Sequence, residues 1–260
     1  MAIPRIWVRE ALPRMHDDAA TPAVEVQLDS DASHHIVRVL RSRKGASVVL
    51  FDGHGGEHRA VLSQVDKRRV TALVESFDPI DRESSLHVTL ALGLSRGERM
   101  DFALQKATEL GASALVPITT ARSVVRLDSE RAERRHSHWR QVIVSACEQS
   151  GRTRIPRLAS PQSFSEWLDE DLLAPIRLVL DPQAPPLTAV CDEASEVLVA
   201  VGPEGGFDAS ELEQLSRRGF QRITLGPRVL RTETAAAAAV LFAQLRWGDM
   251  GRALAAHRPV

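Results

Sequence analysis

Val201-Gly202-Pro203-Glu204-Gly205-Gly206-Phe207-Asp208 ends an apolar run, and Leu225-Gly226-Pro227-Arg228-Val229-Leu230-Arg231-Thr232-Glu233-Thr234 follows a short strand-like segment further along. Each stretch predicts a loop that leaves a strand and enters a helix. Gly-Pro and Gly-Gly pairs remove side chains and fix backbone dihedrals, so that main-chain N–H and C=O groups can contact a ligand directly. Two such loops facing each other would form a pocket.

A phosphate-binding loop of the common kinds is not indicated. The sequence contains neither G-x-x-x-x-G-K-[ST] nor G-x-G-x-x-G. Glu204 would also place a negative charge where a phosphate would have to lie. A nucleotide hydrolase is therefore disfavoured, since the phosphate-loop lysine and a clear pair of magnesium-binding carboxylates are both missing.

From His87 onward, strand-like and helix-like segments alternate. Apolar residues recur at helical spacing between Met100 and Leu110, and Asp208 followed by Glu211 is typical of a helix start. Strands are expected at 87–92, 114–117, 176–180, 197–201 and 222–225, and a further helix at 138–149. This alternation predicts an α/β fold with a mostly parallel sheet, whose ligands lie beyond the carboxyl ends of the strands. Both glycine-containing loops fall at such ends.

The last long helix is expected to begin with Thr232 as its N-cap. Residues 235–243 form an uninterrupted apolar run within it. A helix that is apolar around its whole circumference has to be covered on several sides. It is therefore either central to its own domain or also packed against a partner chain.

The N-terminal part of the chain has a different secondary-structure pattern. Short β-rich runs at 47–51, 57–65 and 70–74 predict an all-β region, most economically a small barrel. Residues 77–85 are polar, contain proline and show no periodicity, so we expect a linker there. The low aromatic content and the absence of tyrosine disfavour a platform on which single-stranded RNA bases would stack.

The composition of the chain constrains its function less closely than the motifs do. The 260-residue chain has a formal net charge of −1, so no global basic field indicates nucleic acid. The charges are uneven, however, with eight Arg/Lys against three Asp/Glu from Arg38 to Arg69, and nine against four from Arg122 to Arg157. Two such basic surfaces suit a protein that docks on RNA, although solvated faces of ordinary kind have the same composition.

Cysteine usage and hydropathy point to an ordinary cytoplasmic protein. Cys147 and Cys191 are the only cysteines and lack paired spacing, so neither a disulfide scaffold nor a zinc site is expected, and no metal is expected. Arg5, Arg9 and Glu10 interrupt any apolar run that would serve as a signal peptide, and no segment is long enough to span a bilayer. We therefore expect no membrane association.

The order of motifs resembles the SPOUT class of methyltransferases, and within it the bacterial enzymes that methylate N3 of one uridine in small-subunit ribosomal RNA. The matching residues run from about residue 35 to 235 and cover most of the chain. They are His35, Val39-Leu40-Arg41, Lys106-Ala107-Thr108-Glu109-Leu110-Gly111, Glu148-Gln149-Ser150 with Arg152, Gly202-Pro203-Glu204-Gly205-Gly206-Phe207, Leu225-Gly226 and Val229-Leu230-Arg231-Thr232-Glu233-Thr234-Ala235.

The resemblance implies an α/β fold of the SPOUT type, with a mostly parallel sheet and a C-terminal trefoil knot. A small PUA-like β-barrel that docks on RNA would precede it, giving domains at 1–76 and 86–260. The resemblance also implies S-adenosylmethionine as cofactor and a homodimer formed through the last helix. The partner would be small-subunit ribosomal RNA or the assembled small ribosomal subunit, and the exact nucleotide stays open.

Under this reading, the two loops hold the cofactor mainly through backbone groups. The expected cofactor-binding residues are Leu180, Val201, Gly202, Pro203, Glu204, Gly205, Leu225, Gly226, Val229, Leu230, Arg231 and Thr232. The expected RNA contacts are His35, Arg38, Arg41, Arg122 and Arg152.

Methyl transfer to uridine N3 sets a further requirement, because N3 carries a proton at neutral pH. A base, or a cation that stabilises the developing uracil anion, is needed. The catalytic candidates are Arg231, Glu233 and Glu204, with Arg231 suited to the cation role. Glu204 and Glu233 have simpler interpretations as a loop brace and as a charge favourable to a helix dipole. The identity of the base therefore stays open, as do two alternatives: a SPOUT enzyme with another target, such as the ribose 2′-OH, and a non-catalytic RNA-binding assembly factor.

Overall fold

The computed structural model describes residues 3–14, 23–67, 69–125, 129–185 and 193–251. The chain divides into two compact units. The N-terminal unit comprises Met1–Glu83 and Cys147–Ile155, and the sheet unit comprises Ser84–Ala146 and Pro156–Val260.

The N-terminal unit is built on a five-stranded sheet in the order β1-β3-β4-β5-β2. Its strands are β1 (Arg5–Trp7), β2 (Val24–Gln27), β3 (Ser47–Phe51), β4 (Glu57–Val65) and β5 (Val70–Asp78). Strand β1 pairs with β3 in parallel, and the remaining pairs are antiparallel. Alternate residues of β3, β4 and β5 enter one apolar core together with Ile6 and Ile36.

The expectation of an all-β region is wrong for one segment. Helix α1 (Ser30–His34) begins at Asp29, whose side chain accepts hydrogen bonds from two backbone N–H groups of the first turn. It runs directly into a π-helical segment, η1 (His35–Leu40). Ile36 is fully buried there and anchors the segment to the core of the unit.

A strap formed by residues 147–155 completes the N-terminal unit. Gly55 N–H donates to the Thr153 carbonyl at 3.2 Å, and His54 forms an isolated antiparallel bridge with Arg154. Arg152 is buried, and its guanidinium donates to the Glu83 carboxylate at 2.9 and 2.6 Å. These bonds attach the strap to both the β3–β4 loop and the end of the first part of the chain.

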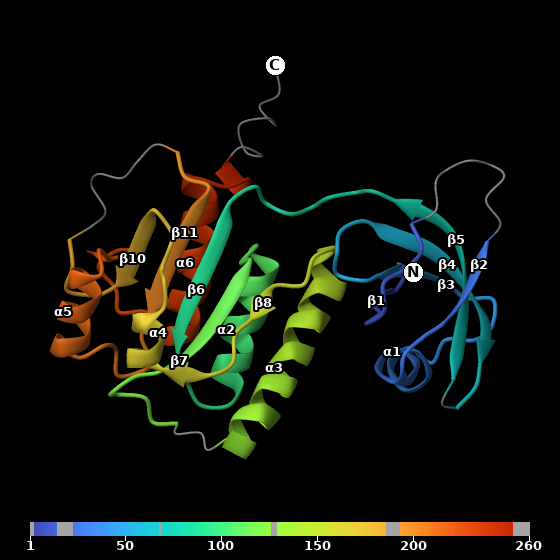
Figure 1. Ribbon diagram of the computed structural model, residues 1–260, viewed down its shortest axis with the longest axis horizontal. Coiled ribbons are helices and arrows are strands. Elements are labelled where there is room, and N and C mark those ends of the chain that lie inside the picture. The colour runs from blue at the N-terminus through green and yellow to red at the C-terminus, as the bar shows by residue number, and fades with distance from the viewer. Residues whose placement is uncertain (1–2, 15–22, 68, 126–128, 186–192, 252–260) are drawn as a thin grey trace. The chain divides into compact units, whose positions relative to one another are not determined.

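The sheet unit has one parallel sheet in the order β12-β10-β11-β6-β7-β8, with β9 also paired to β7 (Figure 1). The strands are β6 (His87–Gly93), β7 (Ala114–Thr119), β8 (Arg157–Leu158), β9 (Gln162–Ser163), β10 (Ile176–Leu180), β11 (Glu196–Val201) and β12 (Gln221–Ile223). The predicted α/β fold with a mostly parallel sheet is confirmed. Because all these strands are parallel, their carboxyl ends lie at the same edge.

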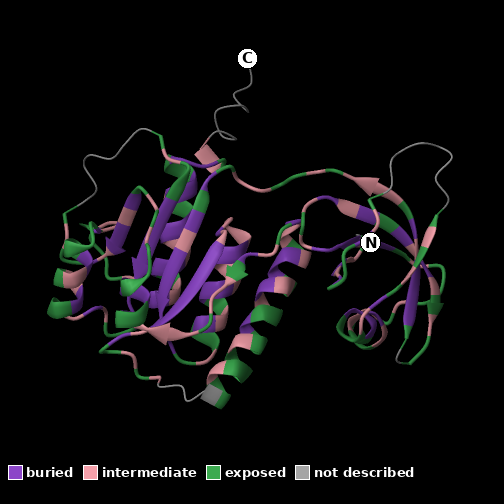
Figure 2. Cartoon of the chain, viewed as in Figure 1, coloured by how far each residue is buried: buried purple, intermediate pink, exposed green. Residues whose placement is uncertain are grey.

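The central strands of the sheet are apolar and buried along most of their length, because helices cover the sheet; Figure 2 shows this burial. The helices are α2 (Glu98–Glu109), α3 (Ser129–Ser150), α4 (Phe164–Asp169), α5 (Ala209–Arg217) and α6 (Thr232–Arg246). Helices α4 and α5 contribute Trp167 and Leu215 to a cluster that also contains Leu198 of β11. Helix α6 packs against α2, β6 and β11.

The start of α6 differs by one residue from the expectation. Arg231 is the N-cap, and its side chain makes no capping hydrogen bond, whereas Thr232 is the first helical residue. Asp208 and Glu211 do form the reciprocal capping box that the sequence indicates, at the start of α5.

Candidate functional site

A cavity of about 940 Å³ opens at the carboxyl ends of β10, β11 and β12, within the sheet unit. Two loops dominate its lining: the first loop, residues 201–207, and the second loop, residues 225–231. All the predicted cofactor-binding residues line this cavity except Gly226. Of the catalytic candidates, Arg231 and Glu204 line it and Glu233 does not.

The first loop is folded tightly upon itself. Gly206 N–H donates to the Pro203 carbonyl at 2.8 Å and closes a turn. A Cβ atom on Gly202 would lie 2.9 Å from backbone atoms of both Gly206 and Phe207. Gly202 is therefore required by the packing of the loop's own backbone, in addition to any ligand.

Glu204 is tied to the beginning of α2. Its Oε1 accepts from Arg99 Nη1 at 3.1 Å and from Arg96 N–H at 3.4 Å. Partial burial alone would raise the pKa of Glu204, but hydrogen bonds from its own backbone N–H, Arg96 N–H and Arg99 outweigh that effect and lower the pKa. Glu204 is consequently an ionised brace at neutral pH and a weak proton acceptor.

Several side chains of the second loop are exposed. Thr224 Oγ1 donates to the Gly226 carbonyl at 2.9 Å, and Gly226 has φ +119°, a conformation that side chains disfavour. Val229 is 82% exposed, and Arg228 and Arg231 are also exposed. Within the described residues, the Arg231 side chain makes no hydrogen bond or ion pair, so its charge is available at the rim of the cavity.

Asp181 and Arg222 are among the cavity residues that were not expected from the sequence. Asp181 follows β10, is buried, and accepts from Arg222 Nε at 2.7 Å and from Gln183 N–H at 2.9 Å. Arg222, on β12, also lines the cavity. Its place in the sequence could have predicted Asp181 as a site residue, because it comes directly after a buried parallel strand, where ligand-contacting side chains gather.

Glu233 lies in the first turn of α6 and is half-buried. Its Oε2 atom is buried and has no hydrogen-bond partner among the described residues. Because Glu233 does not line the cavity, it is poorly placed to accept a proton from a ligand bound there.

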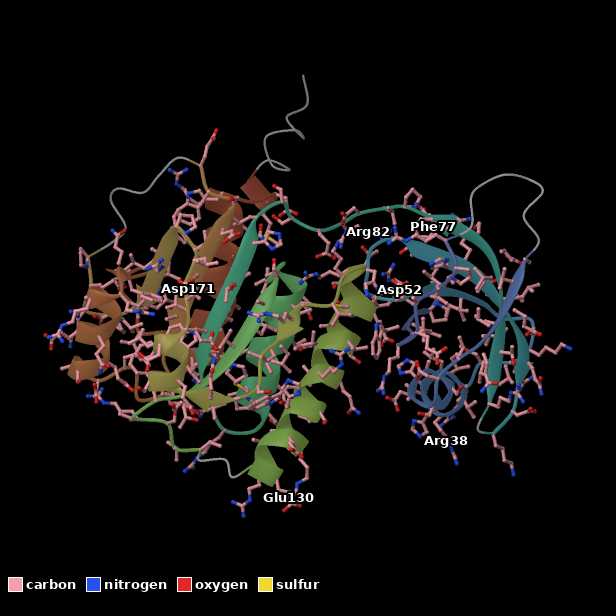
Figure 3. The ribbon with its side chains drawn as sticks, viewed as in Figure 1. Arg38, Asp52, Phe77, Arg82, Glu130 and Asp171 are labelled. Carbon is pink, nitrogen blue, oxygen red and sulfur yellow. The ribbon has the colours of Figure 1, made fainter. Side chains whose placement is uncertain are left out.

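The predicted RNA contacts fall in different places. His35 lies on η1 together with the exposed Arg38, which Figure 3 labels, and Arg41 follows η1 in a left-handed conformation with φ 51°. Arg152 is buried in its ion pair with Glu83, which argues against the predicted RNA contact and indicates a structural role. Arg122 belongs to the sheet unit, where its guanidinium contacts the first loop.

Other chemistries find less support in the described part of the chain. No cluster of three or more metal-ligating side chains occurs among those residues. Burial raises the pKa of Cys147 to about 12, so this thiol is a core residue rather than a nucleophile. Across the same residues, no helix combines the length and the apolar character that crossing a membrane requires.

Family comparisons agree with this architecture. The family described as RNA methyltransferase domain matches residues 82–244, and the RNA methyltransferase PUA domain matches residues 28–75. The ribosomal RNA small subunit methyltransferase E of Bacillus subtilis is 35% identical over 211 residues, which cover 78% of this chain and 82% of the relative. The chain therefore belongs to the RNA methyltransferase family and groups with the small-subunit methyltransferases E.

Solved structures extend the match to nearly the full chain. A ribosomal RNA small subunit methyltransferase E from Neisseria gonorrhoeae, bound to S-adenosylmethionine, is 36% identical with a TM-score of 0.85, and the match covers 96% of this chain and 100% of that one. A protein from Legionella pneumophila, described as a methyltransferase and solved with the same cofactor, is 33% identical with a TM-score of 0.89 and the same coverage.

Proposed function

We propose that this protein transfers the methyl group of S-adenosylmethionine to N3 of a uridine in 16S ribosomal RNA. The observation that carries the proposal is the cavity between two Gly/Pro-containing loops at the carboxyl ends of parallel strands, in a chain of the RNA methyltransferase family. The N3 position follows from the resemblance of the loop and helix motifs to the uridine-N3 enzymes.

The residues of the cavity suit S-adenosylmethionine. The volume of about 940 Å³ is within the usual range for sites that enclose a small ligand. Leu180, Leu225 and Leu230 offer apolar surface to an adenine ring, while the backbone of both loops offers hydrogen-bonding groups. The carboxylates of Glu204 and Asp181 also line the cavity, where each is ion-paired with an arginine, Arg99 and Arg222 respectively.

When bound, S-adenosylmethionine supplies a methyl group that is already activated by its sulfonium, so the protein mainly supplies alignment. Arg231 lines the cavity and stabilises the negative charge that develops on the uracil ring as N3 loses its proton. Glu204 is held ionised by hydrogen bonds from its own N–H, Arg96 N–H and Arg99, and it shapes the first loop. Since Glu233 lies outside the cavity lining, we assign the N3 proton to water rather than to either carboxylate.

Nucleoside analysis tests the function directly. The purified protein is incubated with isotopically labelled S-adenosylmethionine and either free 16S ribosomal RNA or small subunits that lack the modification. The digested RNA is expected to contain labelled 3-methyluridine by mass spectrometry. Label in a 2′-O-methylated nucleoside would instead identify another RNA target, and cofactor binding without any transfer would identify a non-catalytic assembly factor.

We further propose that the N-terminal unit docks on RNA through η1 and the residue after it. Helices of the π type are rare and frequently occur at functional sites, and Ile36 fixes η1 to the core while Arg38 and Arg41 stay exposed. The proposed domains are residues 1–76 together with 147–155, and residues 86–260 without 147–155. Because its substrate is ribosomal RNA, we place the protein in the cytoplasm, which cell fractionation would test.

Arg38→Ala combined with Arg41→Ala is expected to weaken RNA binding and to flatten its salt dependence by about one unit of log–log slope per lost phosphate contact. Filter binding at several salt concentrations measures both quantities. Arg9→Ala is the matched control, because Arg9 is exposed in the same unit and already paired with Asp31 at 3.2 Å. A slope unchanged from that of the control would exclude η1 as the RNA contact.

A homodimer through α6 is part of the same proposal. Leu241 and Leu245 are exposed on this otherwise largely buried helix, and Phe102 is exposed on α2, which packs against it. Leu241→Glu is expected to convert a dimer into a monomer by light scattering, because in a two-fold interface each change occurs twice. Leu173→Glu, at an exposed loop leucine, should leave the dimer intact. A wild-type monomer that still binds cofactor would refute the interface.

A further inference from the structure

The segment that follows β7 is preshaped as a turn. Thr120 N–H donates to Ser123 Oγ at 3.0 Å, and Ser123 N–H donates to the Thr120 carbonyl at 3.1 Å. Thr120 is buried, so the turn is fixed to the end of its strand. This turn presents Ala121 and Arg122 at the carboxyl edge of the sheet.

Glu211 attaches this turn to the segment that follows the first loop. Its side chain is buried, with Oε1 accepting from Ala121 N–H at 2.7 Å and Oε2 accepting from Asp208 N–H at 2.9 Å. One carboxylate therefore satisfies two backbone donors from segments about 90 residues apart. A buried carboxylate that accepts a hydrogen bond from each segment fixes the position of both segments.

Arg122 completes the attachment on the first loop itself. Its Nη1 donates to the Gly205 carbonyl at 2.9 Å and to the Phe207 carbonyl at 3.4 Å. The stem of Arg122 packs on the loop as well, since a Cβ atom on Gly205 would lie 3.0 Å from Arg122 Cβ and 3.4 Å from Cδ. The guanidinium thus orients the two peptide planes whose carbonyls it binds.

Strand order explains why this contact is needed. Strand β6 lies between β7 and β11, so the turn after β7 and the loop after β11 meet across the end of β6. Strand β6 ends at Gly93, where a Cβ atom would lie only 2.4 Å from Pro203. The first loop therefore crosses directly over Gly93 and is held on the far side by Arg122.

We propose that Arg122 is a positioning residue for the cofactor site, which sets the backbone of the first loop from outside that loop. The inference rests on the proposed function, because it takes the first loop to hold S-adenosylmethionine. It replaces the role in RNA contact that the sequence indicated for this arginine. Both carbonyls accept from one nitrogen, Nη1, and lysine reproduces this geometry only in part, because its ammonium lies one bond closer to the backbone than Nη1 does.

Arg122→Met separates the hydrogen bonds from the packing, because methionine keeps an aliphatic stem but no donor. Calorimetry is expected to show affinity for S-adenosylmethionine, in the absence of RNA, reduced about tenfold, as the loss of a charge-assisted hydrogen bond predicts. Hydrogen exchange should become faster at the amides of residues 203–208, while the central strands keep wild-type protection. Arg122→Lys should recover part of both effects, which a generally damaged fold would not do.

Arg135→Ala is the control for lost charge, because Arg135 is exposed on α3 in the same unit. It should leave cofactor affinity and loop exchange unchanged. Arg122→Met with wild-type cofactor affinity and wild-type exchange would overturn the inference, and so would a variant that loses only RNA affinity. Failure of the wild-type protein to bind S-adenosylmethionine would instead refute the proposed function, so the two failures are distinguishable.

Discussion

Gly202→Val is expected to reduce affinity for S-adenosylmethionine by about 100-fold. Overpacking costs about 1–3 kcal/mol, and a loss near the upper end of that range lowers affinity by this factor. The reason is local, because a side chain at this position would meet the backbone of Gly206 and Phe207 and force the first loop open. Calorimetry measures the affinity, and circular dichroism should show that the α/β fold survives.

Gly206→Ala is the informative control for this variant. Gly206 has φ +68°, but a Cβ atom there would meet nothing within 4 Å. The substitution therefore imposes a strain of about 1–2 kcal/mol without a clash. We expect a smaller loss of affinity than for Gly202→Val. A folded Gly202→Val protein with wild-type affinity would remove the first loop from the cofactor site.

Arg231→Ala is expected to lower the single-turnover rate of methylation about 100-fold at saturating RNA and cofactor, the usual loss when one donor to a developing anion is removed. Cofactor affinity should change far less, because the contact forms in the chemical step. Rapid-quench assays measure the rate. An unchanged rate would leave Arg231 only a structural role at the start of α6.

The pH profile of the same assay distinguishes the proton acceptors. Raising the pH should partly rescue Arg231→Ala, because a larger fraction of uridine is then already deprotonated. Glu204 has a lowered pKa and stays ionised from neutral pH upward, so it contributes no change of rate across that range. Glu233→Gln should keep the wild-type rate and profile. Loss of the acidic limb in that variant would instead identify Glu233 as the base.

The sequence predicted the alternation of the main strands and helices in the sheet unit, because their periods are clear after His87 and capping signals such as Asp208 with Glu211 are local. It also located both loops of the cavity. It missed β8, β9 and α4, and it placed the start of α3 too late. Helix α1 and η1 were missed because the tertiary packing of Ile36, rather than a regular period, holds them in place. The trefoil knot stays a prediction from the family resemblance.

Pairings between distant residues lay beyond what the sequence can indicate. Arg122 and Arg152 are both arginines in a basic stretch of the sequence, and the family resemblance was interpreted as placing both on RNA. In the fold, Arg122 binds carbonyls 83 and 85 residues away, and Arg152 is buried against Glu83, 69 residues away. Partners at such separations depend on topology, which no local pattern encodes.

The strap has a consequence for synthesis on the ribosome. The N-terminal unit contains residues 1–83 but is closed by residues 147–155, and α3 runs continuously from the sheet unit into that strap. Glu83 consequently gains its buried guanidinium partner only after more than half of the chain has been made. A nascent fragment ending in the linker would expose the surface that the strap covers, so the N-terminal unit completes its fold only after β6, α2, β7 and α3 of the sheet unit have been made.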